Sequence, residues 1–196
     1  MTELSERAII LEHALENENN LKMTLDIGNA YQELRRRIIV AFLEKLQHFV
    51  RQQLNESQWN LNPELLSNPF KKYAGFFVAK KAWAERYSVG FQADQSDARY
   101  LIVGVAKQAE SLPSIEGLKQ TLDSQIRQGK PSAQWDWYHE LKHPYFNWDN
   151  KEALIKLYDG SAVTDLGTYL LRIVTLAAPV IDRHVSKMPA YPPNPD

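Results

Sequence analysis

The stretch HELKH, from His139 to His143, combines residue types and a spacing that could carry out catalysis. It matches the H-E-x-x-H pattern, in which two histidines on one helical face bind Zn²⁺ and the glutamate, here Glu140, acts as general base. A third ligand must come from elsewhere, and Asp149 lies six residues after His143, at a spacing that some metallopeptidases use. The pattern therefore permits a zinc-dependent hydrolase that uses His139, Glu140 and His143.

Three neighbouring residues argue against a zinc site in this stretch. Pro144 follows His143 directly, disfavours the helical conformation at His143, and has no N–H to bond the Glu140 carbonyl. Asp149 is also placed to cap a following helix, and Phe146 stands where related peptidases have a turn glycine. We therefore predict no metal and no cofactor, and interpret the two histidines as ordinary residues at the end of a helix.

Aromatic side chains are concentrated around the HELKH stretch. Such rings stack on nucleic-acid bases, anchor a protein partner, or pack inside a core. We interpret at least half of them as packing and keep the cluster as a candidate partner surface. The residues of this candidate aromatic surface are Trp135, Trp137, Tyr138, Tyr145 and Trp148.

Charge is unevenly distributed along a chain whose net charge is −1. Residues 1–33 contain seven acidic and two basic residues, a net charge of −5, whereas residues 34–90 contain ten basic and four acidic residues, a net charge of +6. Such asymmetry can mark a nucleic-acid or acidic-partner surface. We favour the interpretation that solvated helix faces cluster by sign, because a nucleic-acid-binding domain usually has a more basic total. If the basic segment binds nucleic acid, the contributing residues are Arg35, Arg36, Arg37, Lys71, Lys72, Lys80 and Lys81.

The composition excludes several other classes of protein. A chain of 196 residues with 44% hydrophobic and 24% charged residues is typical of a globular domain. The absence of cysteine excludes disulfides, thiolate metal sites and thiol nucleophiles. The acidic beginning has no long apolar run, and no stretch approaches 18 uninterrupted apolar residues. We therefore expect a cytoplasmic protein without a membrane span.

Hydrophobic periodicity predicts a short helix over 3–16 and, after the polar run NENN, a long helix over 25–54 capped by Thr24. The long helix has two apolar stripes, which is more than a surface helix needs. We expect the second stripe to be covered by the short helix or by a second copy of the chain, which would give a homodimer through helix 25–54. The first stripe is Ile27, Tyr31, Leu34, Ile38, Phe42, Leu46 and Phe49, and the second is Ile39, Leu43, Val50 and Leu54.

The middle of the chain, 55–107, predicts an antiparallel β-meander of three or four strands, because residues 86–94 alternate between apolar and polar and 99–107 return after a turn. Helices are expected over 113–128, from Asp149 to Gly160, and from Ser161 onward. The predicted fold class is α+β, with a small antiparallel meander packed against N-terminal and C-terminal helices. We expect one domain over 1–187 and a flexible proline-rich tail over 188–196.

Several landmarks follow one another in a recognisable order: W-x₅-V-G-F from Trp83 to Phe91, then LIVGVAK, a Trp-rich stretch ending in YFNWDN, and GSAVTDL at the start of the last helix. This order resembles the C-terminal accessory region of bacterial PD-(D/E)xK nuclease-like proteins. The resemblance implies a module that accompanies a catalytic core, with a nuclease subunit or a nucleic acid as partner, in a phage-defence or mobile-element setting.

The nuclease site itself is not predicted in this chain. A (D/E)-x-K motif needs two carboxylates to hold Mg²⁺ and a lysine to serve the attacking water. The nearest approximation is Asp94 or Asp97 followed by Val105-Ala106-Lys107, where Val105 occupies the position of the second carboxylate. We therefore expect a non-catalytic binding module, with the zinc-dependent hydrolase as the alternative.

Overall fold

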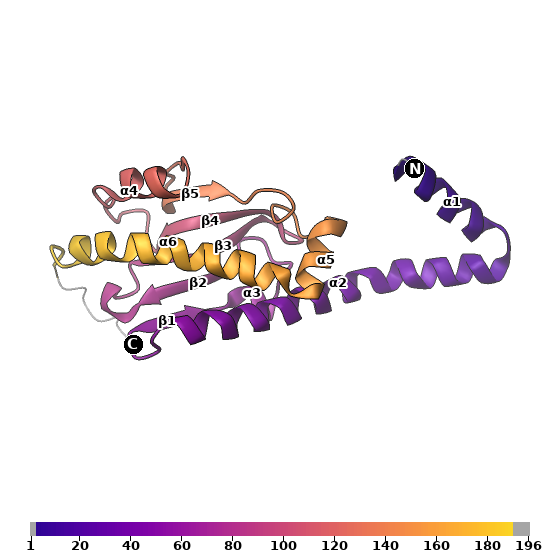
Figure 1. Ribbon diagram of the computed structural model, residues 1–196, viewed down its shortest axis with the longest axis horizontal. Coiled ribbons are helices and arrows are strands. Elements are labelled where there is room, and N and C mark those ends of the chain that lie inside the picture. The colour runs from indigo at the N-terminus through magenta and orange to yellow at the C-terminus, as the bar shows by residue number, and fades with distance from the viewer. Residues whose placement is uncertain (1–2, 190–196) are drawn as a thin grey trace. The chain divides into compact units, whose positions relative to one another are not determined.

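The structure, a computed structural model, describes residues 3–189 of the chain (Figure 1). The chain divides into two compact units, Met1–Arg37 and Ile38–Asp196. The single domain expected over 1–187 stays a prediction. The tail expected over 188–196 lies outside the described residues from residue 190 onward. One long helix, α2, belongs to both units.

The first unit consists of α1 (Glu3–Leu15) and the first part of α2 (Glu18–Gln53). The side-chain oxygen of Asn17 accepts a hydrogen bond from the backbone N–H of Asn20 at 2.9 Å, and so caps α2. Thr24 lies inside the helix, where its hydroxyl donates to the Asn20 carbonyl oxygen at 2.8 Å. The prediction of a cap at Thr24 was therefore wrong, because the polar residues before it are already helical.

The second unit is built on a five-stranded antiparallel sheet in which each strand pairs with the next along the chain. This confirms the α+β class and the meander, with five strands instead of three or four. The fifth strand comes from the Trp-rich stretch that contains His139 and Glu140. The strands are β1 (Trp59–Asn62), β2 (Gly75–Lys80), β3 (Tyr87–Gln95), β4 (Arg99–Lys107) and β5 (Trp135–Glu140).

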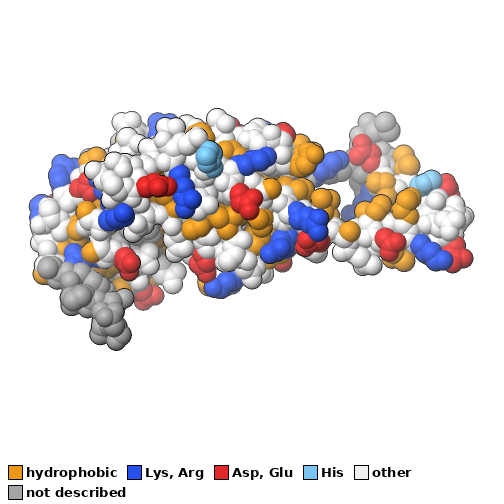
Figure 2. Space-filling view, turned by 90° about the horizontal axis from the view of Figure 1, so that it is seen from below, with side chains coloured by type: hydrophobic (Ala, Val, Ile, Leu, Met, Phe, Trp, Pro, Cys, Tyr) orange, Lys and Arg blue, Asp and Glu red, His pale blue; other side chains and the backbone are white. Residues whose placement is uncertain are grey.

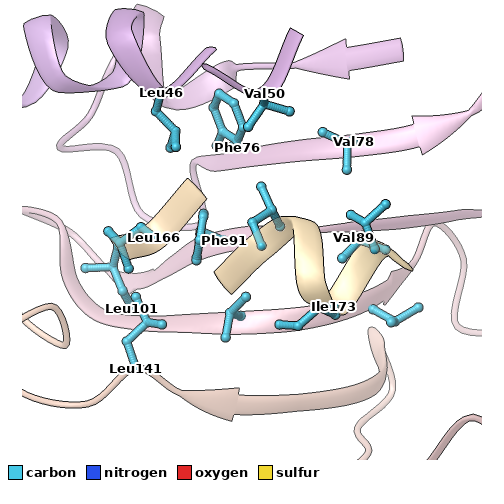
Figure 3. Packing of buried hydrophobic residues seen from close by; sticks show 14 of the residues in the cluster. Leu46, Val50, Phe76, Val78, Val89, Phe91, Leu101, Leu141, Leu166 and Ile173 are labelled. Carbon is cyan, nitrogen blue, oxygen red and sulfur yellow. The ribbon is translucent and has the colours of Figure 1, made fainter. Parts of the chain in front are cut away.

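The helices of the second unit cover one face of this sheet. The later part of α2 and the long helix α6 lie over that face, and their apolar side chains meet those of the strands (Figures 1 and 3). A Cβ atom on Gly167 of α6 would lie 2.6 Å from Cδ1 of Phe49, so the Phe49 ring of α2 packs directly against this glycine and would have to move for a larger residue. Besides α6 (Ser161–Val185), the unit contains α3 (Glu64–Ser67), the 3₁₀ turn η1 (Lys81–Trp83), α4 (Leu118–Gln125) and α5 (Lys151–Asp159).

Helix α6 is long and apolar enough to cross a membrane, and half of its most apolar window is buried inside the second unit. The core helix of a globular protein has the same length and composition. Its buried residues, from Ala162 to Ile181, recur at helical spacing and face the sheet and α2.

The second apolar stripe of α2 is already covered within the second unit. Ile39, Leu43 and Val50 are fully buried and belong to the same core as residues of the sheet and of α6. The expectation that this stripe needs the N-terminal helix or a second copy as cover was therefore wrong. The sequence could not show that α6 occupies that position.

The start of α5 differs from its prediction by one residue. Asn150, rather than Asp149, caps the helix, because its side-chain oxygen accepts a hydrogen bond from the Glu152 backbone N–H at 2.8 Å. The carboxylate of Asp149 instead accepts a hydrogen bond from the Arg99 guanidinium at 2.6 Å. The helix ends, as predicted, at Gly160, whose φ of 87° suits glycine.

Candidate functional site: a pocket beside strand β5 and helix α6

The HELKH stretch is not helical. His139 and Glu140 end strand β5, opposite Val103 and Ile102 of β4, and their side chains therefore point to opposite faces of the sheet. The prediction of a helix end at these histidines was wrong, and the helical spacing that H-E-x-x-H needs is not formed. Within residues 3–189, no group of three or more His, Asp or Glu side chains is arranged to hold a metal ion.

His139 is a buried residue with both ring nitrogens engaged. Its Nδ1 lies 2.7 Å from the carbonyl oxygen of Glu140, and a carbonyl can only accept, so Nδ1 carries the hydrogen. Its Nε2 is then an acceptor, and the Tyr169 hydroxyl of α6 donates to it at 2.7 Å. Burial lowers the pKa of His139 and raises that of Tyr169, so both groups stay neutral. The pair joins β5 to α6.

A pocket of about 370 Å³ opens beside this pair. Its volume lies in the range usual for sites that bind small molecules or side chains. Leu141 and Leu166 are buried and Ile126 is half-buried, so these three give the pocket an apolar part. Its polar lining consists of Arg127, His139, Lys142, His143, Tyr145, Asp165 and Tyr169.

Two cations at this pocket have no partner. Arg127 and Lys142 are exposed, and their side chains make no hydrogen bond or ion pair within the described part of the chain. Their charges also contribute to the lowered pKa of His139, which places both near the imidazole ring. An anionic group entering the pocket would be attracted to both charges.

The pocket also carries a carboxylate. The Tyr145 hydroxyl donates to Asp165 at 2.5 Å, and burial together with this carboxylate raises the pKa of Tyr145. His143 faces Glu152 across 3.8 Å, an ion pair when the imidazole is protonated. The pocket therefore contains two cations without an acidic partner, Arg127 and Lys142, and the carboxylate of Asp165, which already accepts a hydrogen bond from Tyr145.

The candidate aromatic surface does not form as one surface. Trp137 and Trp148 are almost completely buried in the main core, and the Trp137 indole N–H donates to Asp123 at 2.9 Å. Trp135 is also buried, on the opposite face of the sheet, because a β-bulge at Val105/Ala106 shifts the pairing there. These three tryptophans therefore pack inside the second unit and do not contribute to a partner surface.

The two tyrosines of that predicted surface are partly accessible but lie apart. Tyr138 packs beside Trp135 on the outer face of the sheet, with the Lys130 ammonium 5.3 Å from its ring centre. Tyr145 lines the pocket with His139. The sequence therefore identified three pocket residues, His139, His143 and Tyr145, for other reasons. It missed Arg127, Asp165 and Tyr169, which no local pattern connects.

The basic residues proposed for nucleic-acid binding do not form one patch in the second unit. Lys71 and Lys72 precede β2 and Lys80 and Lys81 lie at its end, and a six-residue strand spans about 20 Å. Lys71 pairs with Glu64 at 2.8 Å, and Lys80 pairs with Asp182 at 2.5 Å.

The three arginines of the same proposal belong to α2 in the first unit. Arg35 is buried, Arg36 is exposed, and Arg37 pairs with Glu33 at 2.7 Å. Three of the seven proposed residues therefore already have an acidic partner within the chain.

The nearest approximation to a nuclease motif is also dispersed. Lys107 faces Tyr87 across β3 and β4, and Asp94 lies seven residues further along β3, about 23 Å away. The carboxylate and the lysine are therefore too far apart to share a metal-bound water.

The chain matches no protein-family model, no curated protein and no solved structure. The resemblance to a nuclease-associated region therefore remains a prediction. The chemistry of the pocket is what indicates a function.

Proposed function

We propose that this chain is a non-catalytic binding module whose pocket beside β5 and α6 receives an acidic side chain of a protein partner. The observation that carries the proposal is the pair of unpartnered cations, Arg127 and Lys142, next to an apolar lining. Charge-assisted hydrogen bonds to a carboxylate are among the stronger polar contacts in proteins, and a guanidinium can make two in parallel.

The buried histidine of the pocket is not placed for acid–base catalysis. Both nitrogens of His139 are already hydrogen-bonded, so neither is free to take a proton from a bound molecule. The lining contains no serine, threonine or cysteine that could act as nucleophile. Binding is therefore the function that this arrangement supports best.

The pocket also favours one orientation of its ligand. A carboxylate on the ligand is attracted to Arg127 and Lys142 and repelled by Asp165. An apolar side chain adjacent to that carboxylate could cover Leu141 and Leu166. The resemblance to accessory regions of nuclease-like proteins supports a partner that carries a catalytic core, and this part of the proposal depends on the resemblance alone.

Selection from a displayed library of random peptides against the full chain tests the proposal. We expect the enriched peptides to share an Asp or Glu beside a large apolar residue. The R127E/K142E variant should bind them at least about tenfold more weakly, since it replaces two attractive charges by repulsive ones. A matched control, K45E/K187E, makes the same charge change at exposed lysines outside the pocket and should bind normally. Peptides without acidic residues, or equal binding by both variants, would overturn the proposal.

A further inference from the structure

The second unit leaves few large hydrophobic side chains uncovered, and two of them line one pocket. Fourteen such side chains are exposed in the described chain, and ten of them belong to the first unit, at the right of the view in Figure 2. The four in the second unit are Tyr73, Tyr100, Ile155 and Tyr158. Tyr73 and Tyr100 both line a pocket of about 290 Å³, close to the lower end of the range for sites that bind small molecules.

This pocket lies on the outer face of the sheet, the face that points away from α2 and α6. Phe91 of β3 belongs to the core, and side chains alternate along a strand, so Gln92 and Asp94 point to the outer face. Ile102 of β4 lies opposite Gln92, and Glu140 of β5 lies opposite Ile102. The floor of the pocket is therefore a row of side chains that crosses three strands.

Aromatic rings border this row on both sides. Trp135 and Tyr138 of β5 pack together, with their ring centres 5.9 Å apart. On the other side, the backbone N–H of Tyr73 donates to the Ala93 carbonyl oxygen at 2.8 Å, which holds Tyr73 beside the end of β3. Three strand spacings, about 14 Å, separate β2 from β5. A ligand that contacts rings on both sides is therefore longer than one six-membered ring.

Tyr73 and Tyr100 have an unusual backbone conformation. Their φ angles are 65° and 53°, in the left-handed region that costs free energy for a residue with a bulky side chain. Their side chains are 49% and 44% exposed, so burial of the rings offsets only part of this cost. Residues in such conformations are concentrated at binding sites, which favours a ligand-binding role for these two rings.

The charges around the pocket cancel. Its lining contains the carboxylates of Asp94 and Glu140 and the ammonium of Lys130, which lies 3.9 Å from Glu140. A second ammonium, that of Lys72, lies 4.5 Å from the ring centre of Tyr73. Two positive and two negative charges give no net attraction for a ligand that carries a phosphate or a positive charge. The pocket therefore suits an uncharged ligand.

Two polar side chains of the lining are available to such a ligand. The side chains of Asp94 and Gln134 are exposed and make no hydrogen bond or ion pair within residues 3–189. A carboxylate accepts hydrogen bonds, and an amide both donates and accepts them. The hydroxyls of a sugar also donate and accept, and the C–H groups of a sugar ring can pack against the negative face of an aromatic ring. Rings beside free polar groups are therefore the chemistry that a carbohydrate needs.

We propose that the outer face of the sheet binds a neutral oligosaccharide. Its sugar rings stack on Tyr73 and Tyr100, one hydroxyl donates to the Asp94 carboxylate, and another bonds to the Gln134 amide. Side chains on this face point away from the pocket beside β5 and α6, so the inference is independent of the proposed function.

Titration of the full chain with neutral trisaccharides tests the proposal. The probes are maltotriose, cellotriose, laminaritriose, mannotriose and chitotriose, followed by ligand-observed nuclear magnetic resonance and calorimetry. We expect at least one of them to bind with a Kd in the millimolar range or tighter. The Y73G/Y100G variant should bind it about tenfold more weakly, because it removes two rings at positions whose φ angles suit glycine. The matched control Y158A removes an exposed tyrosine ring of α5 and should bind normally.

Asp94→Asn provides a second variant that does not depend on the rings. Because Asp94 is exposed, D94N should melt at the same temperature as the unaltered chain and bind the trisaccharide several-fold more weakly. The matched control D26N, at an exposed aspartate of the first unit, should bind normally, and so should R127E/K142E. Three results would overturn the proposal: no binding of any of the trisaccharides, unchanged binding by both Y73G/Y100G and D94N, or tighter binding of an oligothymidylate or a trimethyllysine peptide to this face.

Discussion

Residues 38–189 bury a core that extends over one face of a five-stranded sheet, whereas residues 6–37 bury a single hydrophobic side chain. Helix α2 runs through both regions with an uninterrupted apolar pattern. Its later part is covered by α6 and the strands, and its earlier part has no comparable cover within the first unit. The difference teaches that periodicity identifies which face of a helix will be covered, but not which molecule covers it.

Truncating one apolar side chain in each region should give the largest contrast. Phe42→Ala should lower the free energy of unfolding by about 3–5 kcal/mol, because it leaves a cavity in the core. Ile27→Ala should change it by less than about 0.5 kcal/mol. Guanidinium chloride unfolding at low protein concentration measures both, and tryptophan fluorescence reports on the second unit because all five tryptophans lie there. Equal losses at the two positions would contradict the difference in burial.

The pH dependence of the free energy of unfolding gives a second comparison of the two regions, because His139 is buried and His13 is exposed. Burial lowers the pKa of His139 below 6.5, so the unfolded chain binds more protons than the folded chain below that pH. The free energy of unfolding should therefore fall as the pH decreases below 6.5. His139 should contribute at most about 1.4 kcal/mol per pH unit to this fall.

His139→Gln should remove that part of the pH dependence. His13→Gln should retain it, because His13 is an exposed residue of the first unit, paired with Glu16 at 3.0 Å. Urea unfolding at pH 7.5, 6.5 and 5.5 gives the free energy of unfolding against pH for the unaltered chain and for each of the two variants. An unchanged slope in His139→Gln would show that His139 is not the buried neutral group described above.

Two asparagine caps provide the smallest expected difference. Asn150→Ala should lower the free energy of unfolding of the second unit by about 1 kcal/mol, and Asn150→Ser should restore most of it. Asn17→Ala removes the corresponding cap of α2 in the first unit, and should reduce helical circular dichroism without changing the tryptophan-monitored transition. A loss of similar size in the tryptophan signal for both variants would contradict the separation of the two regions.

Much of the fold could be predicted because its signals are local. The alternation over 86–94 and the return over 99–107 correspond closely to β3 and β4, and Gly160 ends α5 as expected. Predictions of helix caps were less reliable, because adjacent polar residues such as Asp149 and Asn150 can both fill the capping position. Only the backbone geometry decides between them.

The pocket could not be predicted, because its residues come from separate parts of the chain. Arg127 follows α4, His139 ends β5 and Tyr169 lies in the middle of α6. The H-E-x-x-H spacing also led to a helical interpretation of a strand, since a β-bulge interrupts the alternation that would have revealed it. Both failures have one physical origin: contacts between distant segments are decided by packing.

The hydrogen bond between Tyr169 and His139 makes the contact between β5 and α6 observable in solution. The Nδ1 proton of His139 is held by a carbonyl inside the second unit, so its exchange with water requires a local opening of the structure. A slowly exchanging imidazole proton gives its own nuclear magnetic resonance signal. That one signal would report when the strand and the helix separate, and a change in its exchange rate would measure how a bound peptide holds them together.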